Sequence, residues 1–262
     1  MGKIIAITTP KGKVGKTTTA INLAVAFALS GKKTLLIDLD PAGSCASGLG
    51  LSKEEVANKL FDDVKLNISL RRYVLKTGIE KLSFIQIERL PYLDSQRLGE
   101  TVTNELILKN ILEPEASAYE YIILDCPPHI IGTINAGLIA ADSVLIPVIP
   151  GKLSIASVRR MIAHINTIRE QYNPKLKIEG ILLTMYEYNN NLSFTSKKEL
   201  FRNYPKYTLN TSIPKNASVK EAAAKNKPLL IYKPNDKAAK AYLRLTDEIS
   251  ERKLLFNSRG KT

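Results

Sequence analysis

A glycine- and lysine-rich run near the amino terminus has the residue types of a phosphate-binding loop. It lies between a β-branched run, Lys3–Thr8, and an alanine-rich helical pattern, Lys16–Ser30, and reads Pro10-Lys11-Gly12-Lys13-Val14-Gly15-Lys16-Thr17-Thr18. Where a strand turns into a helix, backbone N–H groups and the positive end of the helix dipole attract an anion. Lys16 would neutralise the outer phosphates, and the Thr17 hydroxyl would bind Mg²⁺. The sequence therefore predicts a nucleotide site in which this loop surrounds the phosphates.

Two aspartates follow the next apolar strand pattern. The run reads Leu36-Ile37-Asp38-Leu39-Asp40-Pro41, and carboxylates two residues apart lie on one side of a strand. At the carboxyl edge of a parallel sheet, both would face the phosphates of the nucleotide. One carboxylate would orient or deprotonate the attacking water, and the other would hold the magnesium shell. The alternative is a solvated strand end without a ligand.

A third aspartate ends the apolar run Tyr121–Leu124. Four apolar residues followed by Asp125 have the pattern of a Walker B strand, whose carboxylate reaches Mg²⁺ directly or through water. The alternative is an aspartate that caps a turn. Cys126 comes next and has only His129 nearby as a candidate co-ligand, so we expect a packed thiol there.

Strand-like and helical patterns alternate along the chain. We expect strands at Lys3–Thr8, Thr34–Asp38, Leu82–Ile87, Tyr121–Leu124, Val144–Val148 and Ile178–Leu183. We expect helices at Lys16–Ser30, at Lys53–Phe61 behind a Ser52/Glu55 capping box, along the apolar face from Ile155 to Ile168, behind a second capping box at Ser218 and Glu221, and along Ala238–Ile249. This alternation indicates an α/β fold, a mostly parallel twisted sheet with helices on both faces. We expect a single domain at 1–252 and a basic C-terminal tail at 253–262.

The positive charge is concentrated in the last quarter of the chain. The net charge is +13, and residues 197–262 hold 16 Lys and Arg against 6 Asp and Glu, a net of +10. Such a surface favours an anionic partner, with nucleic acid ahead of a membrane surface. The alternative is a basic surface with no specific partner.

The sequence also indicates the compartment. No apolar run reaches the roughly 18 residues that a membrane span needs, and Met1-Gly2-Lys3 leads straight into the first strand pattern, so we expect no signal peptide. The only cysteines, Cys45 and Cys126, are then expected to be reduced thiols in a cytoplasmic protein.

Four segments resemble the ParA/Soj family of DNA-partitioning ATPases, in the ParA/MinD superfamily. The family's deviant Walker A P-loop is similar to KGKVGKTTTAINLAVAFALSGKKTLLIDLDPAGSCASGLGL, and its Walker B region to YEYIILDCPPHIIGTINAGLIAADSVLIPV. Its C-terminal half is similar to IEGILLTMYEYNNNLS and SIPKNASVKEAAAKNKPLLIYKPNDKAAKAYLRLTDEI. The resemblance implies a Mg²⁺-dependent ATPase that forms a homodimer around ATP and binds double-stranded DNA nonspecifically. A ParB-type centromere-binding partner would stimulate hydrolysis, and the cycle would move a plasmid or chromosome origin on the nucleoid.

The resemblance also assigns roles to single residues. Lys11 matches the family's signature lysine, which reaches across the dimer to the phosphates bound by the other chain. Asp40 matches the acidic residue that activates water, which leaves Asp38 for the magnesium shell. Pro214 and Asn216 match the contacts on the adenine side.

One departure from the family lies in the loop itself, where Lys13 stands in place of the usual glycine. In a sandwich dimer the two P-loops face each other, so two copies of this lysine would repel at close range. We therefore expect weak ATP-dependent dimerisation. The alternatives are that Lys13 is an additional phosphate ligand, or that its side chain points to solvent without consequence.

A second departure concerns the DNA surface. Asn189 and Ser218 stand where many relatives carry arginines that contact DNA. The charge distribution still favours DNA, through a different basic face. The candidate residues are Lys197, Lys198, Arg202, Lys215, Lys220, Lys237, Lys240 and Arg244.

Three alternative functions stay open. A MinD-like membrane cycler would use a C-terminal amphipathic anchor, but Leu254-Leu255-Phe256 buries too little area for stable membrane association. A degenerate relative would bind nucleotide with impaired dimerisation, and other relatives position protein cargo instead of DNA.

Overall fold

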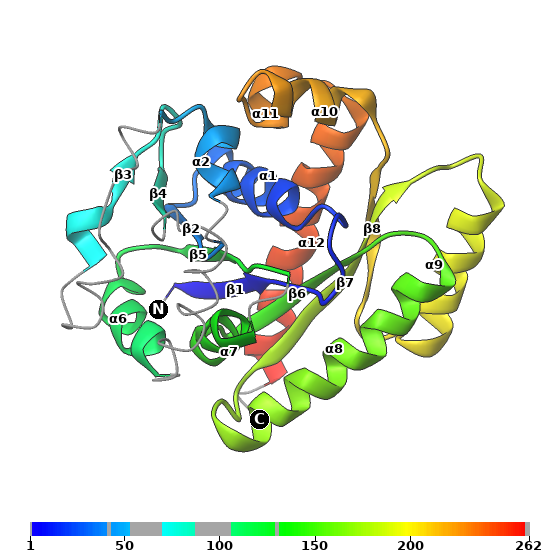
Figure 1. Cartoon of the computed structure of the whole chain (residues 1–262), viewed down its shortest axis with the longest axis horizontal. Coiled ribbons are helices and arrows are strands. Elements are labelled where there is room, and N and C mark those ends of the chain that lie inside the picture. Colours follow the sequence, from blue (N-terminus) through cyan, green and yellow to red (C-terminus); the bar gives the residue numbers. More distant parts are fainter. Residues whose placement is uncertain (1, 41–42, 53–69, 87–105, 129–130, 260–262) are drawn as a thin grey trace.

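The chain folds around one eight-stranded sheet, seen in Figure 1. The computed structural model describes residues 2–40, 43–52, 70–86, 106–128 and 131–259. The strands are β1 (Lys3–Ile7), β2 (Thr34–Asp38), β3 (Leu75–Lys76), β4 (Leu82–Gln86), β5 (Tyr121–Asp125), β6 (Ser143–Val148), β7 (Lys177–Tyr186) and β8 (Thr208–Pro214). Their order is β3-β4-β2-β5-β1-β6-β7-β8, and only the β3–β4 pairing is antiparallel among the described strands. The predicted α/β fold with a mostly parallel sheet is confirmed.

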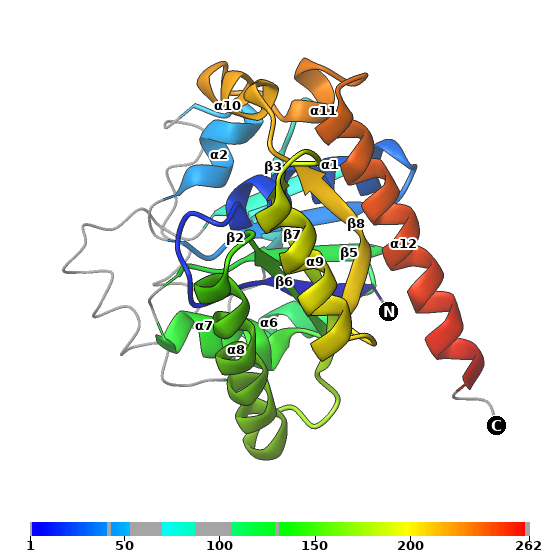
Figure 2. The ribbon, with the colours of Figure 1, turned by 90° about the vertical axis from the view of Figure 1, so that its right-hand side faces the viewer.

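Helices cover both faces of the sheet (Figures 1 and 2). They are α1 (Lys16–Leu29), α2 (Ser44–Leu49), the 3₁₀ helix η1 (Leu70–Tyr73), α6 (Ile107–Glu115), α7 (Ile131–Ala140), α8 (Lys152–Gln171), α9 (Asn191–Asn203), α10 (Ala217–Ala224), α11 (Leu229–Tyr232) and α12 (Lys237–Arg259). One buried cluster lies between the sheet and α6, α7 and α8, and the other between the sheet and α1, α11 and α12. Alternate residues of β1 enter opposite clusters, Ile4 and Ala6 the first, Ile5 and Ile7 the second. Burial on both faces explains why this strand is apolar at successive positions.

The start of α10 differs from the sequence expectation. We predicted a capping box at Ser218 and Glu221, but the helix begins at Ala217 and its N-cap is Asn216. Asn216 has the extended backbone of a cap (φ −145°), and its side-chain oxygen accepts from the Ser218 N–H at 3.0 Å. Ser218 is already inside the first turn, so its hydroxyl cannot cap the helix. The capping-box interpretation was therefore wrong.

Two other sequence predictions concern segments that the structure describes only in part or not at all. The helix predicted at Lys53–Phe61 lies outside the described residues. The backbone of α12 is helical through Arg259, and a separate tail from 253 stays a prediction. No helix among the described residues is both long and apolar enough to cross a membrane.

The strand order brings the predicted site together at one edge of the sheet. β5 lies between β1 and β2, and the register pairs Asp125 with both Ile7 and Asp38. All three strands run in the same direction, so the loop after β1 and the two strand-end aspartates meet at the carboxyl edge. Ligands of open α/β sheets bind at this edge.

Candidate nucleotide phosphate site

The loop after β1 has the backbone of an anion-binding turn. Gly15 is the N-cap of α1 and has a left-handed backbone (φ 83°), which a residue with a Cβ adopts only with strain. A Cβ there would meet no atom of the described residues within 4 Å, so glycine is needed for its backbone conformation and not to avoid a collision. Among the residues that the structure describes, no side chain caps α1, so its first N–H groups are available to an anion.

Lys16 is the buried cation of this loop. Its residue is only 7% exposed, and its Nζ donates to the Lys11 carbonyl oxygen at 3.4 Å. Burial lowers the pKa of Lys16, while the carboxylates of Asp125 and Asp40 act in the opposite direction. A phosphate bound at this loop would give the buried ammonium group charge-assisted hydrogen bonds.

Two aspartates form a buried acidic pair next to this lysine. The Asp38 carboxylate accepts from the N–H groups of Asp40 and Cys45, both at 2.9 Å, and so fixes the turn that follows β2. Burial, with the neighbouring Asp125 carboxylate, raises the pKa of Asp38 well above its ordinary value. Burial also raises the pKa of Asp125 to about 6, although side-chain hydrogen bonds from Thr17 and Cys45 oppose the rise. Both shifts follow from burying two carboxyl groups close together, an arrangement that a bound cation would stabilise.

These residues fit a magnesium ion. Ligand atoms of Asp38, Cys45 and Asp125 lie within 4.8 Å of one another, and the buried Oδ1 of Asp125 has no hydrogen-bond partner in the described part of the chain. With the Thr17 hydroxyl beside Asp125, the oxygen donors are those that Mg²⁺ prefers. The Cys45 thiol donates a hydrogen bond to Asp125 Oδ2 at 3.4 Å. Burial raises the pKa of this thiol well above the ordinary value, so the thiol is neutral.

The sequence analysis did not assign some residues that lie at this site. Besides Cys45, these are Thr184 and Ser154, both buried. The Thr184 hydroxyl lies 2.9 Å from the Val14 carbonyl oxygen and 3.0 Å from that of Val148, and so ties the loop to β6 and β7. The Ser154 hydroxyl accepts from Lys11 Nζ at 2.8 Å. Nothing in the local pattern of either residue signals these contacts.

Lys13 is exposed and has a left-handed backbone, with φ 59°. For a residue with a Cβ this conformation costs about 1 kcal/mol or slightly more. A glycine would avoid the cost. The position is therefore one whose backbone suits glycine, but which carries a long cationic side chain directed to the surface.

The two predicted adenine contacts lie where β8 passes into α10. Pro214 ends β8, and Asn216 caps α10. The Asn216 amide nitrogen also donates to the Asp236 carboxylate at 3.0 Å, and Asp236 accepts from the Ala238 N–H in the first turn of α12. Asn216 thus joins α10 to α12, and its contact with adenine stays a prediction.

Seven of the eight predicted basic residues lie on α9, α10 and α12 around the sheet edge formed by β8, and Lys215 lies between β8 and α10. Figure 2 shows α9 and α12 on either side of β8, with α10 beyond its end. Most of these side chains are exposed, but Lys197 is half-buried and donates to the Asn210 carbonyl oxygen at 3.0 Å. Lys215 forms an ion pair with Glu187 at 3.1 Å. These two lysines are the less available members of the set.

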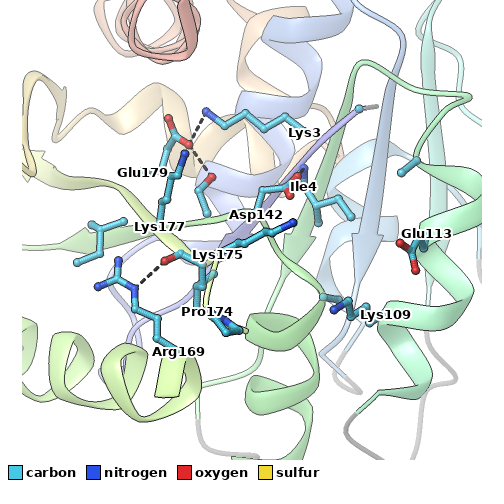
Figure 3. Close-up of a pocket in the computed structure, with 16 residues that line it drawn as sticks. Lys3, Ile4, Lys109, Glu113, Asp142, Arg169, Pro174, Lys175, Lys177 and Glu179 are labelled. Carbon is cyan, nitrogen blue, oxygen red and sulfur yellow. Dashed lines mark hydrogen bonds and ion pairs between the residues drawn. The ribbon is translucent and has the colours of Figure 1, made fainter. Parts of the chain in front are cut away.

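A cavity of about 790 Å³ lies at the opposite, amino edge of the sheet (Figure 3). Its lining includes Lys3, Asp142 and Glu179. Glu179 pairs with Lys3 at 2.6 Å and accepts from the Ser143 hydroxyl at 2.5 Å. This buried network joins strand ends far from the loop, and the cavity is not part of the phosphate site.

Comparison with known proteins agrees with this geometry. A family model described as "AAA domain" matches residues 2–178. The chain is 37% identical to the sporulation initiation inhibitor protein Soj of Bacillus subtilis (strain 168), over 95% of this chain and 99% of the relative. It is 33% identical to the chromosome partitioning protein ParA of Myxococcus xanthus (strain DK1622), over 96% of this chain and 89% of the relative.

A solved structure shows the same fold. It is an ATP complex of a Cyanothece McdA variant, which matches with a TM-score of 0.82 and 21% identity over 95% of this chain and 96% of the other. The similarity to Soj and ParA extends over nearly the full length of the chain, and at this level of identity it shows the family as well as the fold. The chain belongs to the ParA/Soj family of partition ATPases.

Proposed function

We propose that this protein is a Mg²⁺-dependent ATPase of DNA partitioning. The observation that carries the proposal is the buried acidic pair of Asp38 and Asp125 beside Thr17 and Lys16, at the carboxyl edge of the sheet. Amide groups of residues 12–18 would bind the phosphates, and Lys16 would bind the outer ones. Thr17 and Asp125 would hold Mg²⁺, with Asp38 in its shell, and the ion would neutralise charge that develops on the phosphates. Asp40, next in the turn, would orient or deprotonate the attacking water.

The same proposal extends to partners. ATP would hold two copies together as a homodimer, with Lys11 reaching the nucleotide of the other copy. The dimer would bind double-stranded DNA nonspecifically on the nucleoid, in the cytoplasm, and a ParB-type centromere-binding protein would stimulate hydrolysis. The names of the relatives, chromosome partitioning protein ParA among them, support this cycle for a plasmid or chromosome origin.

The direct test is release of phosphate from ATP, measured with Mg²⁺ and after its removal with EDTA, each with and without duplex DNA. We expect hydrolysis only with Mg²⁺, and a change in rate when DNA is added. Absence of both ATP binding and hydrolysis in the presence of Mg²⁺ would contradict the proposal.

We expect DNA binding to tolerate sequence changes and to weaken steeply with salt, because lysines recognise phosphates and not bases. Replacing Lys237 and Lys240, both exposed on α12, with glutamine should reduce the slope of log affinity against log salt by up to about 2. Fluorescence anisotropy with duplexes of unrelated sequence measures the slope. A Lys109→Gln, Lys175→Gln variant is the charge-matched control, because both lysines line the cavity at the amino edge. Equal slopes in all three proteins, or affinity for one sequence only, would disprove this assignment.

We expect ATP-dependent dimerisation to be weak, and Lys13→Gly to strengthen it. The glycine removes a positive charge from the dimer interface, and it suits the left-handed backbone at this position. Sedimentation with a slowly hydrolysed ATP analogue compares the two proteins. Lys13→Ala separates the causes, because alanine removes the charge and keeps the backbone strain. A parent protein that is a tight dimer and loosens in Lys13→Gly would favour the alternative in which Lys13 is a phosphate ligand.

A further inference from the structure

The ammonium group of Lys11 does not lie free over the phosphate loop. Its Nζ donates to the hydroxyl of Ser154 at 2.8 Å, across 143 positions of sequence. Ser154 is only 1% exposed and lies in the first turn of α8. The start of α8 is anchored in turn, because the N–H of Gly151 donates to the Ser196 hydroxyl of α9 at 3.0 Å. The acceptor for Lys11 is therefore held in place by the fold.

The surroundings of this contact make it a weak position for a cation. The acceptor is a neutral hydroxyl, and the amino-terminal end of a helix carries positive partial charge, which disfavours an ammonium group. A phosphate oxygen carries negative charge, so with the same lysine it would form a hydrogen bond between two ionised groups, which is stronger than a bond from the ammonium group to a neutral hydroxyl. A nucleotide polyphosphate can therefore displace Ser154 as the partner of Lys11.

We propose that Ser154 is a positioning residue that holds Lys11 on α8 in the nucleotide-free chain and releases it to the terminal phosphate of ATP. The inference rests on the proposed ATP-binding function. Breaking the Lys11–Ser154 contact is then a cost of ATP binding, whether the phosphate is bound by the same chain or by the other chain of a dimer. ADP lacks the terminal phosphate and leaves the contact in place. Because of this cost, the parent chain prefers ATP to ADP by a smaller factor than a chain without the Ser154 hydroxyl would.

The test compares Ser154→Ala with the parent by titration calorimetry, using a slowly hydrolysed ATP analogue and, separately, ADP. Loss of the hydroxyl should strengthen analogue binding about three- to tenfold, because a charged hydrogen bond no longer has to be broken. ADP affinity should change less than about twofold. Ser157→Ala is the matched control, since Ser157 is equally buried on α8 and its hydroxyl donates to the Ser154 carbonyl oxygen instead of contacting Lys11. It should leave both affinities as in the parent.

A double-mutant cycle shows whether the serine acts through the lysine. In a Lys11→Ala background, Ser154→Ala should no longer change analogue affinity. Equal strengthening of ATP-analogue and ADP binding, or a Ser154→Ala effect that persists without Lys11, would overturn the inference. So would a parent that binds the analogue with the same affinity as Ser154→Ala. A parent that binds neither nucleotide would overturn the proposed function itself, and the two failures are thereby distinguished.

Discussion

Replacing Lys16 with alanine should weaken binding of Mg·ATP about ten- to hundredfold. Hydrogen bonds to a charged group contribute roughly 1.5–3 kcal/mol each, and each 1.4 kcal/mol changes affinity about tenfold. Lys16 is buried at the loop, next to the carboxylates of Asp125 and Asp40. Its removal leaves these negative groups to repel the phosphates. Titration calorimetry in the presence of Mg²⁺ measures the loss.

The control for this experiment is Lys32→Ala. Lys32 follows the opposite end of α1, and its Nζ pairs with Glu120 at 3.1 Å on the surface. This variant loses the same charge at a site that does not face the loop, so its ATP affinity should match that of the parent. If Lys16→Ala also binds ATP as the parent does, the loop is not the phosphate site.

Replacing Asp40 with alanine should leave ATP binding largely intact and slow turnover by about 10²–10⁴-fold, the range that general acid–base groups contribute. The Asp40 N–H donates to the Asp38 carboxylate at 2.9 Å. The backbone of the turn is therefore held by Asp38 and should persist in the variant, while the carboxylate that we propose to face the attacking water is lost. Single-turnover measurements with saturating ATP separate the chemical step from binding.

Two further variants sharpen this prediction. Asp40→Asn keeps a polar group that can orient water but cannot accept its proton, so a rate between those of parent and alanine variant would indicate that orientation contributes. Asp247→Asn removes an exposed carboxylate of α12 and should hydrolyse ATP at the parent rate. Hydrolysis by Asp40→Ala at that rate would exclude Asp40 as the residue that orients or deprotonates the attacking water.

The sequence by itself determined the sheet and the strand ends at which the candidate phosphate site lies. β1, β2 and β5 are apolar at successive positions because both faces are covered, and this pattern is local and easily read. Asp38 and Asp125 were placed at strand ends from their own flanking residues, and parallel pairing then brings them into register. Gly15 reflects a left-handed backbone requirement that local sequence also indicates.

Tertiary structure decided the partners of these groups. Cys45 contacts Asp125 across 80 positions of sequence, and Lys11 contacts Ser154 across 143. A local sequence pattern cannot predict which distant hydroxyl or thiol the fold brings close to a given side chain. The cap of α10 was likewise set by where the chain leaves β8, because Asn216 takes the extended backbone there and Ser218 does not. Propensity and spacing specify elements and their edges, whereas a side chain's hydrogen-bond partner depends on how packed elements meet in space.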